Sequence, residues 1–174
     1  MRPLYENSKT LLDEVNFFRD LKNSIPEFKG CRFRKLPIRY EIECVIEDIT
    51  KGDVTAFAEF KRRYNDRDKY PTLFISLAKY KKLLEYDDLR AAILFVRWRD
   101  VDGMHVLGDH LQDILNYKIM WGGRNDRGDW QDNEPVIHVP VEHFKVLQIN
   151  KTEFTPQEIT FWNEKWSSGE GWMV

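Results

Sequence analysis

The sequence predicts an α/β or α+β fold with a mixed β-sheet flanked by helices. Three observations support this prediction: helical spacing of apolar residues near the N-terminus, an alternating hairpin in the first half, and a continuous apolar run at residues 91–99. Along the chain these features give the order helix, hairpin, helix and strand. That order is typical of a fold in which helices pack on a sheet.

The first expected element is an amphipathic helix at residues 9–22. Leu12, Val15 and Phe18 recur at the spacing of one helical face. Ser8 stands just before them and is the expected N-cap.

Two strands are expected next, at residues 39–47 and 54–61. Both stretches are rich in β-forming residues and alternate in part. We expect a three-residue loop, 50–52, to join them, with Gly52 where a left-handed residue is favoured.

The rest of the chain is expected to add helices and strands around this hairpin. These elements are a loop at 64–71, a helix that Ser76 caps and that runs to about Tyr86, a buried strand at 91–99, a strand within 136–147, and a helix that starts at Thr155-Pro156. We expect residues 1–150 to form one domain, with the helix and tail of residues 151–174 packed on it.

The composition indicates a globular protein of the cell interior. Hydrophobic residues make up 42% of the 174 residues and charged residues 32%, so the chain can form a core and is not disordered as a whole. No apolar run approaches the roughly 20 residues of a membrane span, and the N-terminus does not resemble a signal peptide. Cys31 and Cys44 have no metal-finger spacing and are expected to be free, buried thiols in a reducing compartment. A cytoplasmic location without membrane contact follows.

The charge pattern is uneven along the chain. The net charge of −2 argues against a strongly basic nucleic-acid-binding protein. Residues 31–99 nevertheless carry an excess of Lys and Arg, whereas residues 100–174 carry an excess of Asp and Glu. The basic part agrees with a phosphate-bearing substrate, but a charge difference of this size is common by chance and plain solvation of surface charges is the favoured explanation.

The hairpin carries a candidate chemical site. Glu59 and Lys61 project from one face of a strand, because side chains alternate. In the expected register Glu43 lies directly opposite Glu59, and Glu41 lies opposite Lys61. Directly opposed residues have Cβ atoms about 4.5–5.5 Å apart.

Two carboxylates at that distance repel each other unless a positive group lies between them. Mg²⁺ or Mn²⁺ suits such a place because these ions prefer carboxylate and carbonyl oxygens and keep several waters. Lys61, on the same face, is then placed to orient a metal-bound water or to hold a phosphate. The alternative is an ordinary exposed ladder of charges, and a one-residue slip of the register would turn Glu43 away.

The wider context of this hairpin resembles the PD-(D/E)XK nuclease superfamily, in particular its small phage-encoded members. The resemblance covers roughly residues 5–147 and rests on segments 40–46, 56–63, 75–80, 94–98 and 122–135. It implies a restriction-endonuclease-like fold and metal-dependent hydrolysis of DNA phosphodiesters.

The resemblance also implies roles for single residues. Glu43 takes the place of the first acidic ligand, Glu59 that of the second and Lys61 that of the lysine, and the backbone carbonyl of Phe60 is a further metal ligand. Lys79 matches a basic position that supports catalysis or contacts phosphate. One departure is that the first acid is normally Asp, whereas this chain has Glu43, which is longer by one methylene.

Several further residues are candidates. Glu14, on the first helix, matches a carboxylate that some members contribute to the metal, and a solvent-facing helical charge is its alternative. Glu41 and Glu47 compete with Glu43 for the first acidic position. The candidate substrate-binding residues are Arg62, Arg63, Arg124 and Arg127.

Three other features have no clear functional pattern. The Gly-rich stretch 122–130 fits either a structural turn or a loop that grips phosphates. The four histidines form no HExxH pair, and we expect them to be structural or at the surface. The tryptophans of the C-terminal segment fit core packing, an interface or a homodimer contact.

The leading hypothesis is therefore a phage-type endonuclease that uses Mg or Mn. Its partner is a nucleic acid, DNA rather than RNA, and it acts in the cytoplasm (of the host, if the chain is phage-encoded). The alternative is a catalytically inactive nuclease fold that serves as a nucleic-acid-binding or protein-assembly module.

Overall fold

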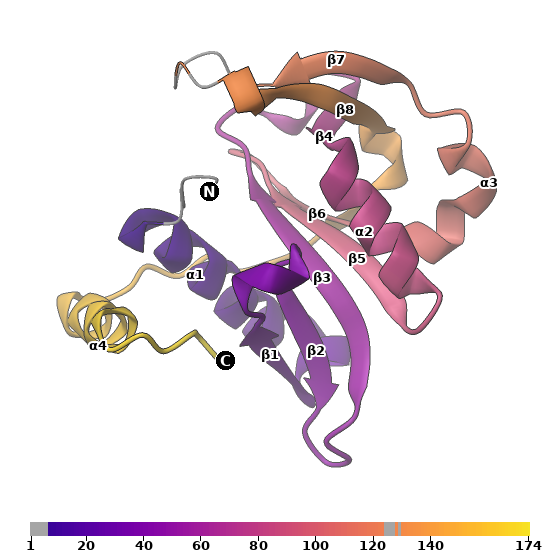
Figure 1. The fold of residues 1–174 in the computed structure, drawn as a ribbon. Coiled ribbons are helices and arrows are strands. Elements are labelled where there is room, and N and C mark those ends of the chain that lie inside the picture. The colour runs from indigo at the N-terminus through magenta and orange to yellow at the C-terminus, as the bar shows by residue number, and fades with distance from the viewer. Residues whose placement is uncertain (1–6, 124–127, 129) are drawn as a thin grey trace.

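The computed structural model describes residues 7–123, 128 and 130–174. Within these residues the fold has two β-sheets, and helices lie beside them (Figure 1). The larger sheet has the strand order β1-β2-β3-β5-β6-β9, and the smaller has the order β4-β8-β7. The strands are β1 Cys31–Lys35, β2 Cys44–Asp48, β3 Val54–Arg62, β4 Thr72–Ser76, β5 Ala91–Arg97, β6 Asp102–Val106, β7 Ile119–Gly123, β8 Asn133–Pro140 and β9 Lys145–Leu147. The helices are α1 Ser8–Ser24, α2 Leu77–Asp87, α3 Leu111–Ile114 and α4 Pro156–Ser167. This mixed α+β architecture confirms the predicted fold class.

The large sheet is mixed because β3 and β5 run parallel, whereas its other neighbouring strands pair antiparallel. A parallel pair needs a crossover connection, and here the crossover contains β4 and α2. As a result α2 lies against β3 and β5 (Figure 1).

Two hydrophobic cores cover the two faces of this sheet. On one face, α1 contributes Phe17 and Phe18, which pack with Phe60 of β3 and Phe95 of β5. On the other face, α2 contributes Tyr80 and Leu83 to a second core. Because side chains alternate along β3, Phe60 faces α1 while Glu59 and Lys61 belong to the face of α2.

Several predicted elements agree with the observed ones. The first helix is two residues longer at its C-terminal end than predicted, and Asn7, not Ser8, caps it by accepting from the Thr10 N–H. The buried strand at 91–99 appears as β5. Thr155 caps α4, with Pro156 at the first helical position, as expected.

Other expectations were wrong. Residues 39–43 are not strand: residues 38–40 form a 3₁₀ turn, and Glu41 follows with a left-handed φ of 59°. The prediction missed β1, β4, β6 and β7, each of which has five residues, and it missed the three-residue β9. Ser76 does precede α2, but it ends β4 and its side chain makes no capping hydrogen bond.

The C-terminal segment folds back onto the body of the protein. Lys35 N–H donates to the Trp172 carbonyl, and Phe33 and Val174 exchange two backbone hydrogen bonds, so the end of the chain pairs with β1. Trp162 and Trp172 are buried within the chain, which supports core packing for these two residues.

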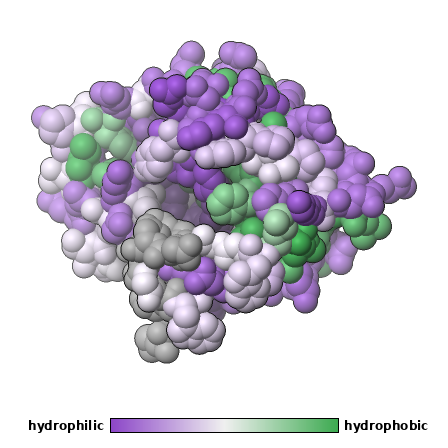
Figure 2. Space-filling view, turned by 90° about the horizontal axis from the view of Figure 1, so that it is seen from above, coloured by the Kyte–Doolittle hydropathy of each residue, from purple (hydrophilic) through white to green (hydrophobic). Residues whose placement is uncertain are grey.

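Seen from above relative to Figure 1, the surface is mostly hydrophilic, with hydrophobic side chains gathered in smaller areas (Figure 2). Cys44 is buried and Cys31 is only partly so, and neither forms a disulfide. Within the described residues, no helix combines the length and the apolar character needed to cross a bilayer.

Candidate active site

Strand β3 places Glu59 at the centre of the candidate site. Its side chain is fully buried. Lys61 lies two residues further along the same face, and its Nζ is 2.8 Å from Glu59 Oε1. Phe60 points to the opposite face and stacks on Phe17 at 4.7 Å, which anchors the strand in the core.

Glu43 is the residue just before β2, whose first residue, Cys44, pairs with Ala58 of β3. The printed register ends there, and one further step in the same direction leads from Ala58 to Glu59 and from Cys44 to Glu43. Glu43 is only 8% exposed. Two buried acidic side chains thus come from β3 and from the residue that precedes β2.

The hairpin reaches this register by a different route from the predicted one. Asp48 N–H donates to the Asp53 carbonyl, so four residues, 49–52, form the loop instead of three. A β-bulge then leaves Thr55 of β3 without a partner and shifts the pairing of β2 and β3 by one residue. The longer loop and the bulge shift the register in opposite directions, so residues 44–46 have the partners that the predicted register gives them.

Helix α2 brings Lys79 to the same carboxylate. Its Nζ is 2.9 Å from Glu59 Oε1, so one oxygen of Glu59 receives two ammonium groups. Burial of Lys79 disfavours its charged form, but the charges of Glu59 and Glu43 outweigh this and raise its pKa. Lys79 is therefore a fixed positive charge at neutral pH.

Glu14, on α1, is buried and also lies at the site. Lys35 of β1 joins it to the hairpin, because Lys35 Nζ lies 3.0 Å from Glu14 Oε2 and 2.6 Å from Glu43 Oε1. Burial, and then the neighbouring Glu43 carboxylate, raise the pKa of Glu14 well above its ordinary value. Glu14 therefore holds a proton and donates a hydrogen bond to Glu43.

Two residues of the site escaped prediction. Lys35 ends β1, and the alternation in Cys31–Lys35 is the signal that could have revealed this strand. Trp172 donates its indole N–H to Glu14 Oε2 at 2.9 Å and is 1% exposed. The one signal in the sequence that could have pointed to Trp172 is that a large aromatic residue stands in a polar tail.

The rival acidic residues lie elsewhere. Glu41 is exposed in the turn before β2 and does not face Lys61; its nearest cation is Lys82, at 4.0 Å. Glu47 pairs with Arg34 at 2.9 Å. The expected pairing of Glu41 with Lys61 was wrong, because the chain turns at Glu41 before it enters the strand.

Of the candidate substrate arginines, the structure describes Arg62 and Arg63, and both donate to backbone carbonyls. Arg62 donates to the backbone carbonyls of Arg97 and Trp98 at 3.1 Å. Arg63 donates to the Phe74 carbonyl at 2.8 Å. Arg124 and Arg127 lie outside the described residues, as does most of the Gly-rich stretch.

The donor set fits a hard divalent cation. Glu59 Oε2 is buried and accepts no hydrogen bond from the residues that the structure describes, which is costly for a carboxylate unless a positive group approaches it. In the described part of the chain, however, the carboxylate oxygens of Glu14, Glu43 and Glu59 do not all lie within 4.8 Å of one another. Three lysines separate and compensate them instead, so a cation would compete with ammonium groups for these oxygens.

One of three comparisons with known proteins gives a match. No curated protein and no solved structure matches the chain. A sequence model of the family described as "Phage putative PDDEXK endonuclease" matches residues 1–147. The chain therefore belongs to this phage PD-(D/E)XK endonuclease family.

Proposed function

We propose that this protein hydrolyses phosphodiester bonds of DNA with the help of Mg²⁺ or Mn²⁺. The observation that carries the proposal is the environment of Glu59. This carboxylate is fully buried, one of its oxygens lacks a hydrogen-bond partner, and Glu43, Lys61 and Lys79 surround it. Burial of a charged group costs free energy of folding, and buried charged groups with this kind of environment are common at catalytic sites.

Glu43 and Glu59 would hold the cation, with the backbone carbonyl of Phe60 and the Glu14 carboxylate as further ligands. A divalent cation bound there lowers the pKa of a coordinated water and offsets negative charge that develops on phosphorus. Glu14 must lose its proton before it can contribute, because its pKa is raised in the metal-free protein.

The two lysines that contact Glu59 would orient the attacking water and bind the scissile phosphate. Both ammonium groups lie on Glu59 Oε1, and they become free for other acceptors once this carboxylate is neutralised by a cation. Lys61, on the same face as Glu59, then orients the attacking water through its N–H groups. Lys79, on α2, pairs with an oxygen of the scissile phosphate.

The test is cleavage of single-stranded, duplex and branched DNA with Mn²⁺ or Mg²⁺. Lys61→Ala should lower the rate by about 10²-fold or more. Lys51→Ala, in the exposed hairpin loop, is the matched control and should act like wild type. Equal cleavage by wild type and Lys61→Ala, or none by either, would refute the proposal.

A specific observation also favours a second function, a catalytically silent module that binds DNA or a protein. Lys35, Lys61 and Lys79 already compensate the acidic cluster, as they would in a site that has lost its metal. Glu43 in place of the usual Asp points the same way. DNA binding that Glu59→Gln leaves unchanged, without metal-dependent turnover, would support this function, and turnover would exclude it.

A further inference from the structure

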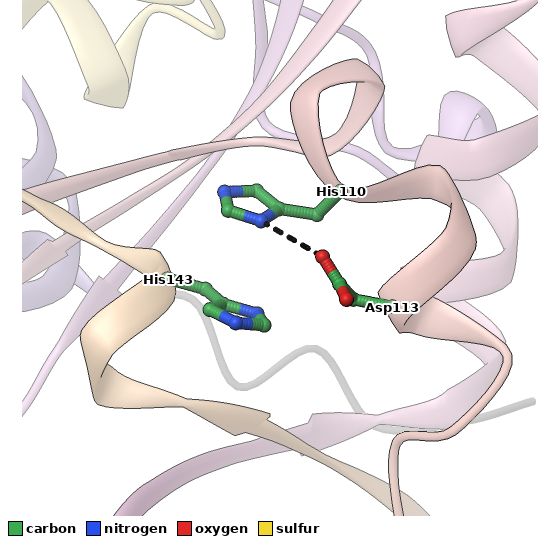
Figure 3. A group of neighbouring side chains, drawn as sticks. All are labelled: His110, Asp113 and His143. Atoms are coloured by element: carbon green, nitrogen blue, oxygen red, sulfur yellow. Dashed lines mark ion pairs between the residues drawn. The ribbon is translucent and has the colours of Figure 1, made fainter.

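A second cluster of metal-ligating side chains lies outside the acidic site. His110 ends the 3₁₀ turn Leu107–His110, Asp113 belongs to α3, and His143 ends the 3₁₀ turn Val141–His143. One ligand atom from each of the three lies within 4.8 Å of the other two. Figure 3 shows the three side chains gathered between the two turns.

The two imidazole rings are stacked. Their centroids are 4.4 Å apart and their planes differ by 15°. His110 Nδ1 lies 3.6 Å from Asp113 Oδ2 (Figure 3). The side chain of His110 is 24% exposed and that of Asp113 is 59% exposed, so solvent and ions can reach the cluster.

Two buried residues, Tyr117 and His105, form hydrogen bonds with His143. Its Nδ1 lies 2.5 Å from the Tyr117 hydroxyl. Its backbone carbonyl lies 3.0 Å from Nδ1 of the buried His105, whose Nε2 in turn meets the Tyr80 hydroxyl at 2.8 Å. Partners of this kind fix the orientation of metal-binding histidines and select their tautomer. In the tautomer with the proton on Nδ1, which then donates to the Tyr117 hydroxyl oxygen, the Nε2 lone pair of His143 is available to a metal.

We propose that His110, Asp113 and His143 form a binding site for a transition-metal dication of the zinc class. Two imidazoles and one carboxylate are ligands that zinc favours, whereas magnesium prefers oxygen ligands alone. Three protein ligands leave a coordination position for water. The site therefore differs in chemistry from the acidic cluster around Glu59, which has no imidazole.

Binding requires only local adjustment. Zinc holds nitrogen and oxygen ligands at about 2.0–2.2 Å, so ligand atoms on one ion lie roughly 3.3 Å apart. The exposed Asp113 can rotate toward the rings, and the stacked rings must turn so that their lone pairs converge. A bound ion would then tie the 107–114 segment to the turn at 141–143, two segments that are far apart in sequence.

The test is a zinc titration of chelator-treated protein, followed through the imidazole resonances by NMR and through the heat of binding. The resonances of His110 and His143 should shift and saturate at one equivalent of zinc, while those of His138 stay in place. Because the acidic cluster has no imidazole, zinc bound there cannot give this signal.

Matched variants complete the experiment. His110→Ala and Asp113→Asn should each weaken zinc binding roughly tenfold or more, whereas His138→Ala should not. Asp113→Asn changes an exposed side chain and keeps the ring stack, so it separates loss of a ligand from loss of the fold. Equal shifts at all histidines, or unchanged affinity in Asp113→Asn and His110→Ala, would overturn the proposal.

Discussion

The indole N–H of Trp172 donates to Glu14 Oε2 at 2.9 Å, so the last residues of the chain contact a carboxyl of the candidate active site. Trp172 also stacks on Phe18 at 5.2 Å. It lies beyond residues 1–147, the part that matches the endonuclease family. A segment outside the family match thus completes the surroundings of an acidic residue inside it.

Trp172→Phe tests the energetic weight of this contact. The substitution keeps an aromatic ring against Phe18 but removes one of the two donors to the buried Glu14 Oε2, so that Lys35 Nζ is the donor that stays. We expect the free energy of unfolding to fall by about 1–3 kcal/mol, measured by urea denaturation. Trp121→Phe, at a position 73% exposed, should change it little. Equal effects of the two substitutions would contradict the role of the hydrogen bond.

A buried ion pair network should dominate the stability around α1. Arg97 binds Asp102 through Nε at 2.8 Å and Asp20 through a second nitrogen at 3.2 Å, and Asp20 also accepts from the Thr152 hydroxyl at 2.6 Å. Asp20→Ala leaves a buried guanidinium partly uncompensated and should cost about 3–5 kcal/mol in urea denaturation. Asp13→Ala, at a partly exposed position of the same helix, is the control and should cost about 0.5 kcal/mol or less. A similar loss in both would show that the network contributes little.

His105 should make the metal-free protein less stable in mild acid. Burial lowers the pKa of His105 to about 4 from an ordinary value of 6.5, so between these values the unfolded chain binds a proton that the folded protein does not. Stability is therefore fully present above pH 6.5 and decreases as the pH falls toward 4. We expect a loss of about 1.5 kcal/mol between pH 6.5 and pH 5.

Urea denaturation with a chelator present, repeated across this pH range, gives the slope. NMR of the imidazole provides the direct check, since His105 should stay neutral at pH 5.5. A His105 ring that titrates near pH 6.5 would contradict the prediction.

Lys79 and Lys81 offer a matched pair on one helix. Lys79 contacts Glu59, whereas Lys81 is exposed. If Lys79 pairs with the scissile phosphate, Lys79→Ala should lower Mn²⁺-dependent DNA cleavage by about 10²-fold, and Lys81→Ala should not. The measurement is the single-turnover rate at saturating metal. A loss of similar size in both variants would indicate a general effect of basic charge.

The central part of the site could be predicted from the sequence because it rests on local rules. Alternation along one strand places Glu59 and Lys61 on the same face, and the hairpin pairs their neighbour Ala58 with Cys44, the residue after Glu43. The loop length was wrong by one residue, but the bulge at Thr55 compensated for it. That compensation could not be foreseen, since a bulge depends on how both strands pack.

The missing parts of the site depend on contacts between distant segments. Lys35 belongs to a five-residue strand whose pattern is too short to stand out. Trp172 reaches Glu14 only after the chain folds back across β1. His110 and His143 likewise meet only in the folded protein, and their spacing in the sequence gives no sign of it.

A crystal of the protein soaked in Mn²⁺ would show whether the buried Glu59 carboxylate binds a metal. The anomalous signal of manganese should appear beside Glu59 Oε2, the buried oxygen that accepts no hydrogen bond, with Glu43 as a second ligand and with Lys79 or Lys61 displaced from Oε1. If no anomalous density appears at the acidic cluster, the metal-dependent active site at Glu59 is contradicted. The same holds if the density appears only at His110, Asp113 and His143.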